Sequence, residues 1–184
     1  DINFNGLIEI EKFLKKKIKK KSLILFVGDN DSISIAHYLA FFRLGHCQIM
    51  IENNITDNSL NDINIKFDPE YIFVNKQRNK INNYKIIKSI DGYNLLQSNQ
   101  KNQSKINKNL ALLISTSGST GKSKFVKITF ENILENTISI QKYLNIKKKD
   151  VGVSTLPISY SYGISVINMH LLNENNFVCN KSSI

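Results

Sequence analysis

The hydrophobic residues of this chain follow two patterns that alternate along the sequence. In some stretches they stand side by side, as in residues 23–27, 47–51, 71–74 and 110–114. Short continuous hydrophobic runs of this kind are typical of parallel β-strands that are covered on both faces. The stretches between them carry hydrophobic residues at intervals of three and four, which indicates helices. The alternation predicts an α/β fold with one or two mostly parallel sheets and flanking helices.

Polar residues mark where several of these elements begin and end. Asp31 and Ser32 supply oxygens that can cap a helix after the first strand, and Gly45 can end that helix. The first strand, this helix and the second strand form a βαβ unit. We expect further helices at residues 5–20, 59–65, 131–144 and 162–172, and further strands at 84–90, 124–130, 150–156 and 176–179.

One polar stretch suggests how the chain is divided. Residues 95–109 are rich in Asn, Gln, Ser and Lys and show no hydrophobic periodicity, which predicts a loop and a boundary between lobes. We therefore expect an N-terminal α/β lobe at residues 1–105 that begins with the βαβ unit. Residues 106–184 are expected to contain a strand–loop–strand segment followed by αβ units.

Composition narrows the class of protein. The 184 residues carry 25 Lys and Arg against 15 Asp and Glu, a formal net charge of +10, yet only Arg43 and Arg78 are arginines. Nucleic-acid-binding proteins more often cluster arginines with stacking aromatic residues, so we expect no nucleic-acid partner. No hydrophobic run approaches the ~20 residues that a membrane span needs. Cys47 and Cys179 form no metal or redox motif, and a cytoplasmic location is the default expectation.

One segment carries recognisable chemistry: residues 113–128 read LISTSGSTGKSKFVKI. Gly118 and Gly121 let the backbone approach a ligand closely, and successive amide groups in such a loop can point into one concavity that binds an anion. The expected ligand is a polyphosphate, and a flexible Ser/Gly linker is the alternative. Hydroxyl and amine donors come from Thr116, Ser117, Ser119, Thr120, Lys122 and Lys124.

The P-loop motif of nucleoside triphosphatases, GxxxxGK[ST], is a competing interpretation of this loop. Gly121, Lys122 and Ser123 match its end, but Thr116 stands where its first glycine is required. That motif also opens a helix directly after its lysine. Residues 124–130 instead alternate as a strand does. A P-loop-like NTPase, or another phosphate- or nucleotide-binding α/β module, stays as the alternative.

The loop resembles the signature TSGSTGxPKG of adenylate-forming enzymes, the family of acyl-CoA synthetases, firefly luciferase and peptide-synthetase adenylation domains. Residues 116–121 match the leading TSGSTG, and Lys124 matches the lysine. Ser123 stands where proline is usual and Phe125 where the last glycine is usual. These departures concern the end of the loop rather than the part that would hold phosphate.

A second segment supports the resemblance. Residues 156–163 read LPISYSYG and are similar to the family's LPxxHxxG segment, with Tyr160 in place of the frequent histidine. The resemblance covers essentially the whole chain but only the front of the family's large domain. The motifs of the later part are not found here, so we expect a fragment. Such a fragment is expected to be inactive alone and to self-associate through an exposed strand edge.

The resemblance implies an ATP-dependent ligase that converts a small carboxylic acid to acyl-AMP with release of pyrophosphate. The acyl group would then pass to the thiol of CoA or of a phosphopantetheine-bearing acyl-carrier protein, and Mg²⁺ would accompany ATP. By the same resemblance, Lys124 is the catalytic residue of the loop, Thr120 helps to bind Mg²⁺, and Tyr160 and Gly163 line the substrate channel. The residues implied to bind the ATP phosphates are Thr116, Ser117, Gly118, Ser119, Thr120, Gly121 and Lys124.

Overall fold

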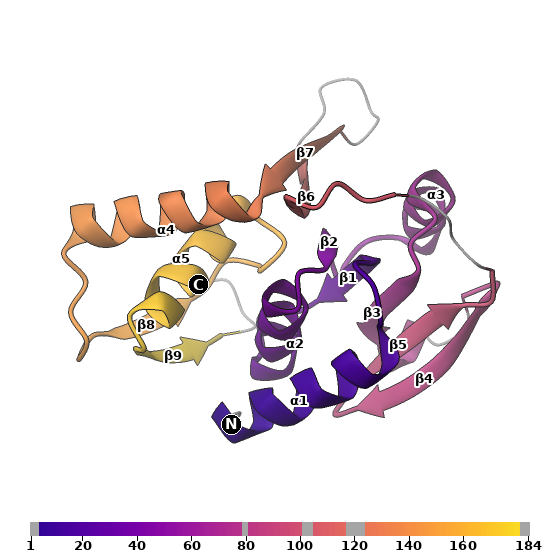
Figure 1. The fold of residues 1–184 in the computed structure, drawn as a ribbon, viewed down its shortest axis with the longest axis horizontal. Helices are drawn as coiled ribbons and strands as arrows, with labels where there is room; N and C mark the ends of the chain where they lie inside the picture. Colours follow the sequence, from indigo (N-terminus) through magenta and orange to yellow (C-terminus); the bar gives the residue numbers. More distant parts are fainter. Residues whose placement is uncertain (1–3, 79–80, 101–104, 117–123, 181–184) are drawn as a thin grey trace.

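The computed structural model describes residues 4–78, 81–100, 105–116 and 124–180 and shows a mixed α/β fold (Figure 1). A seven-stranded sheet forms its centre, and a two-stranded sheet lies to one side. The large sheet contains β1 (Leu23–Gly28), β2 (Cys47–Glu52), β3 (Tyr71–Asn75), β4 (Tyr84–Ile90), β5 (Tyr93–Ser98), β6 (Leu110–Thr116) and β7 (Lys124–Thr129), and the small sheet contains β8 (Val151–Ser154) and β9 (Asn176–Cys179). The helices are α1 (Phe4–Lys17), α2 (Ser32–Arg43), α3 (Asp57–Phe67), α4 (Phe130–Leu144) and α5 (Ser161–Leu172), with a 3-10 turn, η1, at Lys76–Arg78.

The four continuous hydrophobic runs form the central part of the large sheet. The strand order is β4-β5-β3-β1-β2-β6-β7, and the neighbours among β3, β1, β2 and β6 pair in parallel. The outer pairings, β4 with β5, β5 with β3 and β6 with β7, are antiparallel. The predicted α/β fold is confirmed, with parallel strands at the centre of the sheet and antiparallel strands at both margins.

The predicted loop at residues 95–109 is wrong at its beginning. β5 runs to Ser98, and Leu95 and Leu96 are fully buried in a strand that lies between β4 and β3. A tight turn at Asp91 and Gly92, whose φ angles are 27° and 92°, folds β5 back on β4. Asp-Gly between two strands is a strong hairpin signal. The second strand was missed because the residues that follow Leu96 are polar.

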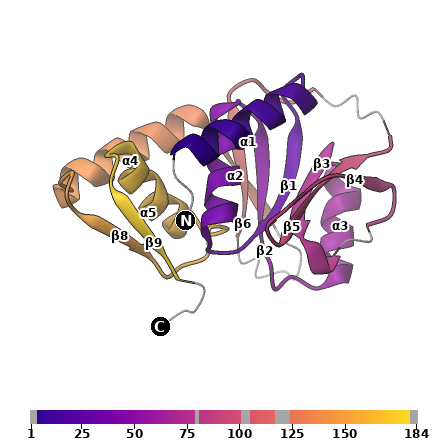
Figure 2. The same ribbon diagram turned by 90° about the horizontal axis from the view of Figure 1, so that it is seen from below.

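Helices cover both faces of the large sheet (Figure 2). Phe26 and Phe73 point to the face that α1 and α2 cover, where their rings stack with centroids 4.9 Å apart. Val27 and Ile49 belong to the core on the opposite face, under α3. Each central strand therefore buries side chains on both faces, which explains why its hydrophobic residues are continuous rather than alternating.

The helix that follows β1 begins as its sequence predicts. The Asp31 carboxylate accepts a hydrogen bond of 2.8 Å from the Ser34 amide and so caps α2. A capping oxygen satisfies one of the free amide groups at a helix start. After α2 the chain turns at Gly45, whose φ angle of 79° favours glycine.

α4, α5, β8 and β9 form a smaller unit beside the large sheet (Figure 1). β8 and β9 pair in parallel within it. The Asn30 amide donates a hydrogen bond of 2.8 Å to the main-chain oxygen of Ser154, and the Tyr38 hydroxyl donates one of 3.1 Å to Asn168 Oδ1. These contacts join the smaller unit to α2 and to the end of β1. The large sheet contains strands from both sides of residue 105. The expected division into two lobes at that residue remains a prediction.

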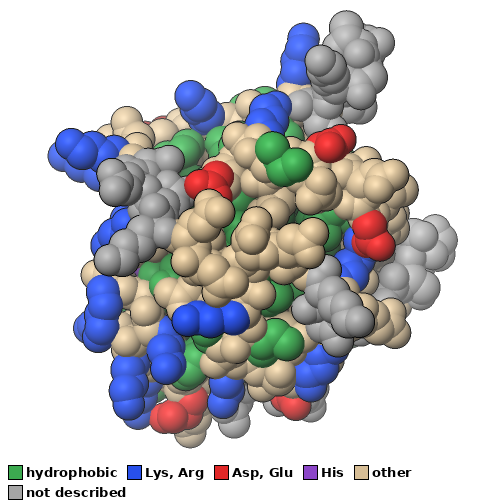
Figure 3. All heavy atoms as spheres, turned by 90° about the vertical axis from the view of Figure 1, so that its right-hand side faces the viewer, with side chains coloured by type: hydrophobic (Ala, Val, Ile, Leu, Met, Phe, Trp, Pro, Cys, Tyr) green, Lys and Arg blue, Asp and Glu red, His purple; other side chains and the backbone are tan. Residues whose placement is uncertain are grey.

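Basic side chains are spread over the face shown in Figure 3, with acidic side chains among them. Two exposed side chains of the described residues, Lys148 and Glu174, form an ion pair of 2.9 Å. Exposed ion pairs of this kind contribute only about 0–1 kcal/mol each to stability. Within the described ranges, no helix is long and hydrophobic enough to cross a membrane.

Candidate active site

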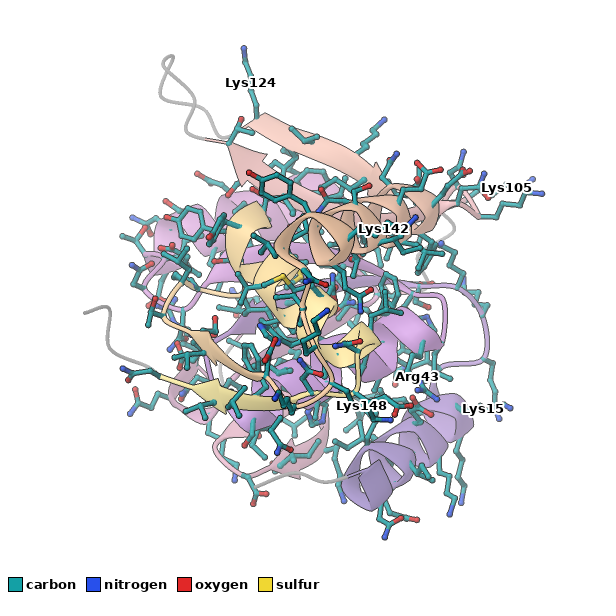
Figure 4. The ribbon with its side chains drawn as sticks, turned by 90° about the vertical axis from the view of Figure 1, so that its left-hand side faces the viewer. Lys15, Arg43, Lys105, Lys124, Lys142 and Lys148 are labelled. Atoms are coloured by element: carbon teal, nitrogen blue, oxygen red, sulfur yellow. The ribbon has the colours of Figure 1, made fainter. Side chains whose placement is uncertain are left out.

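The β6–β7 hairpin brings together the two ends of the predicted phosphate loop. Thr116 pairs with Lys124 across the hairpin, and Thr116 Oγ1 donates a hydrogen bond of 3.5 Å to the Lys124 carbonyl oxygen. Both residues are exposed, and Figure 4 shows the Lys124 side chain extending away from the body of the molecule. Its amine therefore does not pack against the described part of the molecule. Outside the described residues lie the other predicted phosphate and Mg²⁺ ligands, Ser117, Gly118, Ser119, Thr120 and Gly121.

The chain continues after the loop as a strand. β7 begins at Lys124 and pairs with β6 over its length, and α4 begins only at Phe130. A P-loop of a nucleoside triphosphatase instead leads directly into a helix whose N-terminus faces the phosphates. The strand therefore agrees with the TSGSTGxPKG interpretation and counts against the P-loop alternative.

Residues 156–163 form a turn followed by the first residues of α5. The Tyr160 amide donates a hydrogen bond of 3.1 Å to the Pro157 carbonyl oxygen. The Tyr160 carbonyl oxygen accepts a hydrogen bond of 3.0 Å from the Ile164 amide. A Cβ atom placed at Gly163 would lie 2.3 Å from the Pro157 oxygen. Only glycine allows the first turn of α5 to approach the main chain this closely, so Gly163 fixes the turn that carries Tyr160.

This turn and the hairpin meet at a small cavity of about 200 Å³. β2 and β6 are neighbouring parallel strands, and the cavity lies where both of them end. The crevice at the carboxyl ends of parallel strands is the usual place for ligands in α/β folds. Tyr160 lines this cavity and Gly163 does not, and the substrate channel expected at these two residues stays a prediction. The lining residues are Ile51, Glu52, Asn54, Ile55, Ile63, Ser115, Ser159 and Tyr160.

Tyr160 interacts with an acidic residue in this cavity. The nearby Glu52 carboxylate, as a hydrogen-bond acceptor and as a negative charge, raises the pKa of the Tyr160 phenol. Ser159 lies beside it and is only 5% exposed, and its hydroxyl has no hydrogen-bond partner within the described part of the chain. A buried hydroxyl without a partner is uncommon, which marks the cavity as a place where a ligand group can bind.

Sequence reasoning missed the polar residues that line this cavity beside Tyr160, namely Glu52, Asn54, Ser115 and Ser159. Glu52 directly follows a buried parallel strand, and Ser115 precedes the phosphate loop. Their position at strand ends was a usable signal. Ser159 carried no comparable signal, because a serine before a helix is most often a cap or a turn residue.

A larger cavity of about 500 Å³ lies between the β6–β7 hairpin and the helices α4 and α5. Its lining combines aliphatic side chains with amide and hydroxyl groups, and it includes Lys127, Tyr162 and Asn168. It shares no residue with the small cavity. Because its lining lacks a carboxylate or a histidine among the described residues, we place the candidate chemistry at the small cavity.

The remaining ionisable residues of the core have structural roles. Burial lowers the pKa of His46 to about 4, and its Nδ1 accepts a hydrogen bond of 3.3 Å from the Ser22 amide. Burial also raises the pKa of the Cys47 thiol to about 12, so this cysteine is a poor nucleophile. In the part of the chain that the structure describes, no group of three His, Cys, Asp or Glu residues could hold a metal ion.

The β6–β7 hairpin frames the TSGSTG sequence at one margin of a mixed α/β domain. The chain belongs to the AMP-binding enzyme family, whose sequence model matches residues 11–183. No curated protein matches the sequence.

Solved structures share the fold at low sequence identity. Apo MatB from Rhodopseudomonas palustris is similar with a TM-score of 0.78 and 17% identity, over 98% of this chain and 40% of that chain. O-succinylbenzoate coenzyme A synthetase (MenE) from Bacillus subtilis, in complex with ATP and magnesium, has a TM-score of 0.72 and 16% identity, over 98% of this chain and 51% of that chain. Holo-AB3403, a four-domain nonribosomal peptide synthetase bound to AMP and glycine, has a TM-score of 0.74 and 16% identity, over 98% of this chain and 14% of that chain. The chain thus spans at most about half the length of these structures.

Proposed function

We propose that the protein to which this chain belongs activates a carboxylic acid by adenylation. A carboxylate oxygen attacks the α-phosphorus of ATP, the bond between the α-phosphorus and the bridging oxygen breaks, and acyl-AMP and pyrophosphate form. The observation that carries this proposal is the β6–β7 hairpin: it frames the TSGSTG sequence in a chain of the AMP-binding family. The small cavity beside Ser115, close to the loop end of the hairpin, would hold the acid.

The protein's part in this step is to hold the reactants in place and to balance charge. The loop between Thr116 and Lys124 would bind the β- and γ-phosphates through amide and hydroxyl groups. Lys124 would meet the negative charge that grows on the departing pyrophosphate. Among the described residues none forms an ion pair with Lys124, so its charge is available for this role.

Mg²⁺ and a thiol acceptor complete the proposal. Mg²⁺ bound to ATP would supply positive charge at the phosphates, and Thr120 is the residue of this chain assigned to it by resemblance. MenE has been solved with ATP and magnesium, and AB3403 is a multidomain peptide synthetase. We propose that the acyl group then passes to the thiol of CoA or of a carrier protein, which displaces AMP.

Carboxylate-dependent exchange of ATP with labelled pyrophosphate tests the proposed function. The assay uses the protein that contains this chain, and a panel of small aliphatic, aromatic and amino acids. Exchange that requires one acid of the panel together with Mg²⁺ supports adenylation. ATP hydrolysis that proceeds without any acid, and without exchange, would instead support the NTPase alternative. We propose that the 184-residue chain alone catalyses no exchange, and the same assay tests this.

A further inference from the structure

One wall of the small cavity is formed by the loop that connects β2 to α3. Asn54 and Ile55, two residues of this loop, line the cavity. The Asn53 side-chain amide, at the start of the loop, donates a hydrogen bond of 3.1 Å to Asp29 Oδ2. The Ile55 amide donates one of 3.3 Å to the Glu52 carbonyl oxygen. Asn54 itself is exposed, so the shape of this wall depends on what holds the main chain on either side of it.

Arg78 binds this loop from a separate element, because it is the last residue of η1. Its Nη2 atom donates a hydrogen bond of 3.1 Å to the Asn53 carbonyl oxygen and a second one to the Ile55 carbonyl oxygen. These two acceptors stand on either side of Asn54. The Nη1 atom of Arg78 donates a third hydrogen bond, of 2.7 Å, to Asp57 Oδ1 at the start of α3. One guanidinium group therefore holds the loop on both sides of Asn54 and joins it to α3.

The main chain of η1 gives Arg78 a fixed starting point. The Lys76 amide donates a hydrogen bond of 2.8 Å to the Gly92 carbonyl oxygen, in the turn between β4 and β5. The Gln77 amide donates one of 3.0 Å to Asn75 Oδ1 at the end of β3. Hydrogen bonds from a charged donor are stronger than those between neutral groups, and the Arg78 side chain is only 23% exposed. Arg78 therefore connects the edge of the large sheet firmly to the loop.

We propose that Arg78 is a positioning residue that fixes the β2–α3 loop as one wall of the small cavity and so sets how tightly the cavity binds the carboxylic acid. The consequence for the acid rests on the proposed function. A guanidinium group suits this role, because its planar fork presents donors to several acceptors at once, whereas a lysine ammonium is a point charge on a flexible stem. Without Arg78 the carbonyl oxygens beside Asn54 lose these donors and the wall opens more readily. Acid binding then weakens more than turnover does.

The first test observes the loop directly and needs no activity. In the protein that contains this chain, deuterium exchange of the Ile55 amide is followed by mass spectrometry of a peptide that covers residues 53–56. Arg78→Ala should speed this exchange by about tenfold, because the loop and α3 lose three hydrogen bonds from a charged group. Arg78→Lys keeps the charge and should give a smaller increase. Exchange at the parent rate in Arg78→Ala would overturn the proposal, and should that variant fail to fold, the parent rate in Arg78→Lys would do so.

Arg43, the other arginine of the chain, provides the matched control. It forms an ion pair of 2.6 Å with Glu11, and neither of the two residues lines the small cavity (Figure 4 labels Arg43). Arg43→Ala removes the same group and the same charge as Arg78→Ala, and it should leave deuterium exchange at residues 53–56 unchanged. An equal increase in both variants would indicate a general loss of stability and would overturn the proposal.

The second test measures the kinetics of pyrophosphate exchange in the same protein. Arg78→Ala should raise the KM for the acid by about tenfold, with kcat and the KM for ATP changed far less, because a wall of the acid site is loosened. A variant that is merely less stable would lose kcat in proportion to its folded fraction and keep its KM. Arg78→Lys should lie between Arg78→Ala and the parent, and Arg43→Ala should match the parent.

An unchanged KM for the acid in Arg78→Ala would overturn the proposal, even if deuterium exchange of the loop were faster. Should the protein catalyse no acid-dependent pyrophosphate exchange, the proposed function fails. Deuterium exchange at residues 53–56 then still decides whether Arg78 holds the loop.

Discussion

The central strands of the large sheet and the β8–β9 unit differ in how completely their hydrophobic residues are covered. Phe26, on β1, is fully buried, with helices on both sides of its sheet. On the small sheet, Val151, Val153 and Val178 are each more than half exposed. The first region stabilises itself by burial on both faces, whereas the second presents hydrophobic surface that another surface could cover. The comparison indicates that stability is concentrated in the first region.

A pair of core and surface substitutions should give the largest effect and tests this comparison directly. Phe26→Ala removes a ring that stacks on Phe73 in a closed core, and it should lower the free energy of unfolding by about 3–5 kcal/mol. Val153→Ala, on the small sheet, should change it by less than about 0.5 kcal/mol. Urea unfolding followed by circular dichroism measures both. Equal losses in the two variants would show that the exposed sheet is as important to stability as the core.

The next effect concerns activity rather than stability. In the protein that contains this chain, Lys124→Ala should slow pyrophosphate exchange by an amount equivalent to about 2–4 kcal/mol, as the loss of a charged donor at a developing anion does. Lys122→Ala should have a smaller effect, because Lys122 stands at a variable position of the TSGSTGxPKG signature. Unfolding of Lys124→Ala should match the parent, since Lys124 is exposed. If Lys122→Ala abolished exchange and Lys124→Ala did not, the register of the loop would be wrong.

Lowering the pH should reduce the free energy of unfolding, because the core contains a buried histidine. His46 has a pKa of about 4 in the folded chain, because burial and the nearby Lys21 disfavour its charged form, against about 6.5 when unfolded. Because the pKa of His46 is lower in the folded chain than in the unfolded chain, its neutral form stabilises the fold above about pH 6.5. This contribution to the free energy of unfolding, up to about 3 kcal/mol, is lost as the pH falls toward about 4. Urea unfolding between pH 7 and pH 4.5 measures the loss. His46→Gln should reduce the pH dependence, and an unchanged slope would contradict this assignment.

The sequence predicts the well-covered region better than the site. Continuous hydrophobic runs identified β1, β2, β3 and β6, because residues covered on both faces need no polar alternation. The order of these strands could not be read in the same way, since it depends on pairings between segments far apart in the chain. The placement of β6 beside β2 is what brings Ser115 next to Glu52. The cavity that Tyr160 lines also gathers residues from segments far apart in the chain, so a motif search could identify the tyrosine but not the residues that line the cavity with it.

The smallest expected effect is self-association through the exposed small sheet. β8 pairs only with β9 among the described strands, so main-chain groups on its other edge are open to pairing, and Val153 is 56% exposed. Open strand edges with hydrophobic side chains favour pairing with another copy. We expect the chain to associate with increasing concentration in size-exclusion chromatography with light scattering.

Val153→Lys should weaken this association several-fold, because a charged edge residue opposes pairing, without lowering the free energy of unfolding. Ile65→Lys is the matched control, since Ile65 is 70% exposed on α3 in the other region. Association that Ile65→Lys weakens as much as Val153→Lys does would show that net charge, and not the small sheet, controls it.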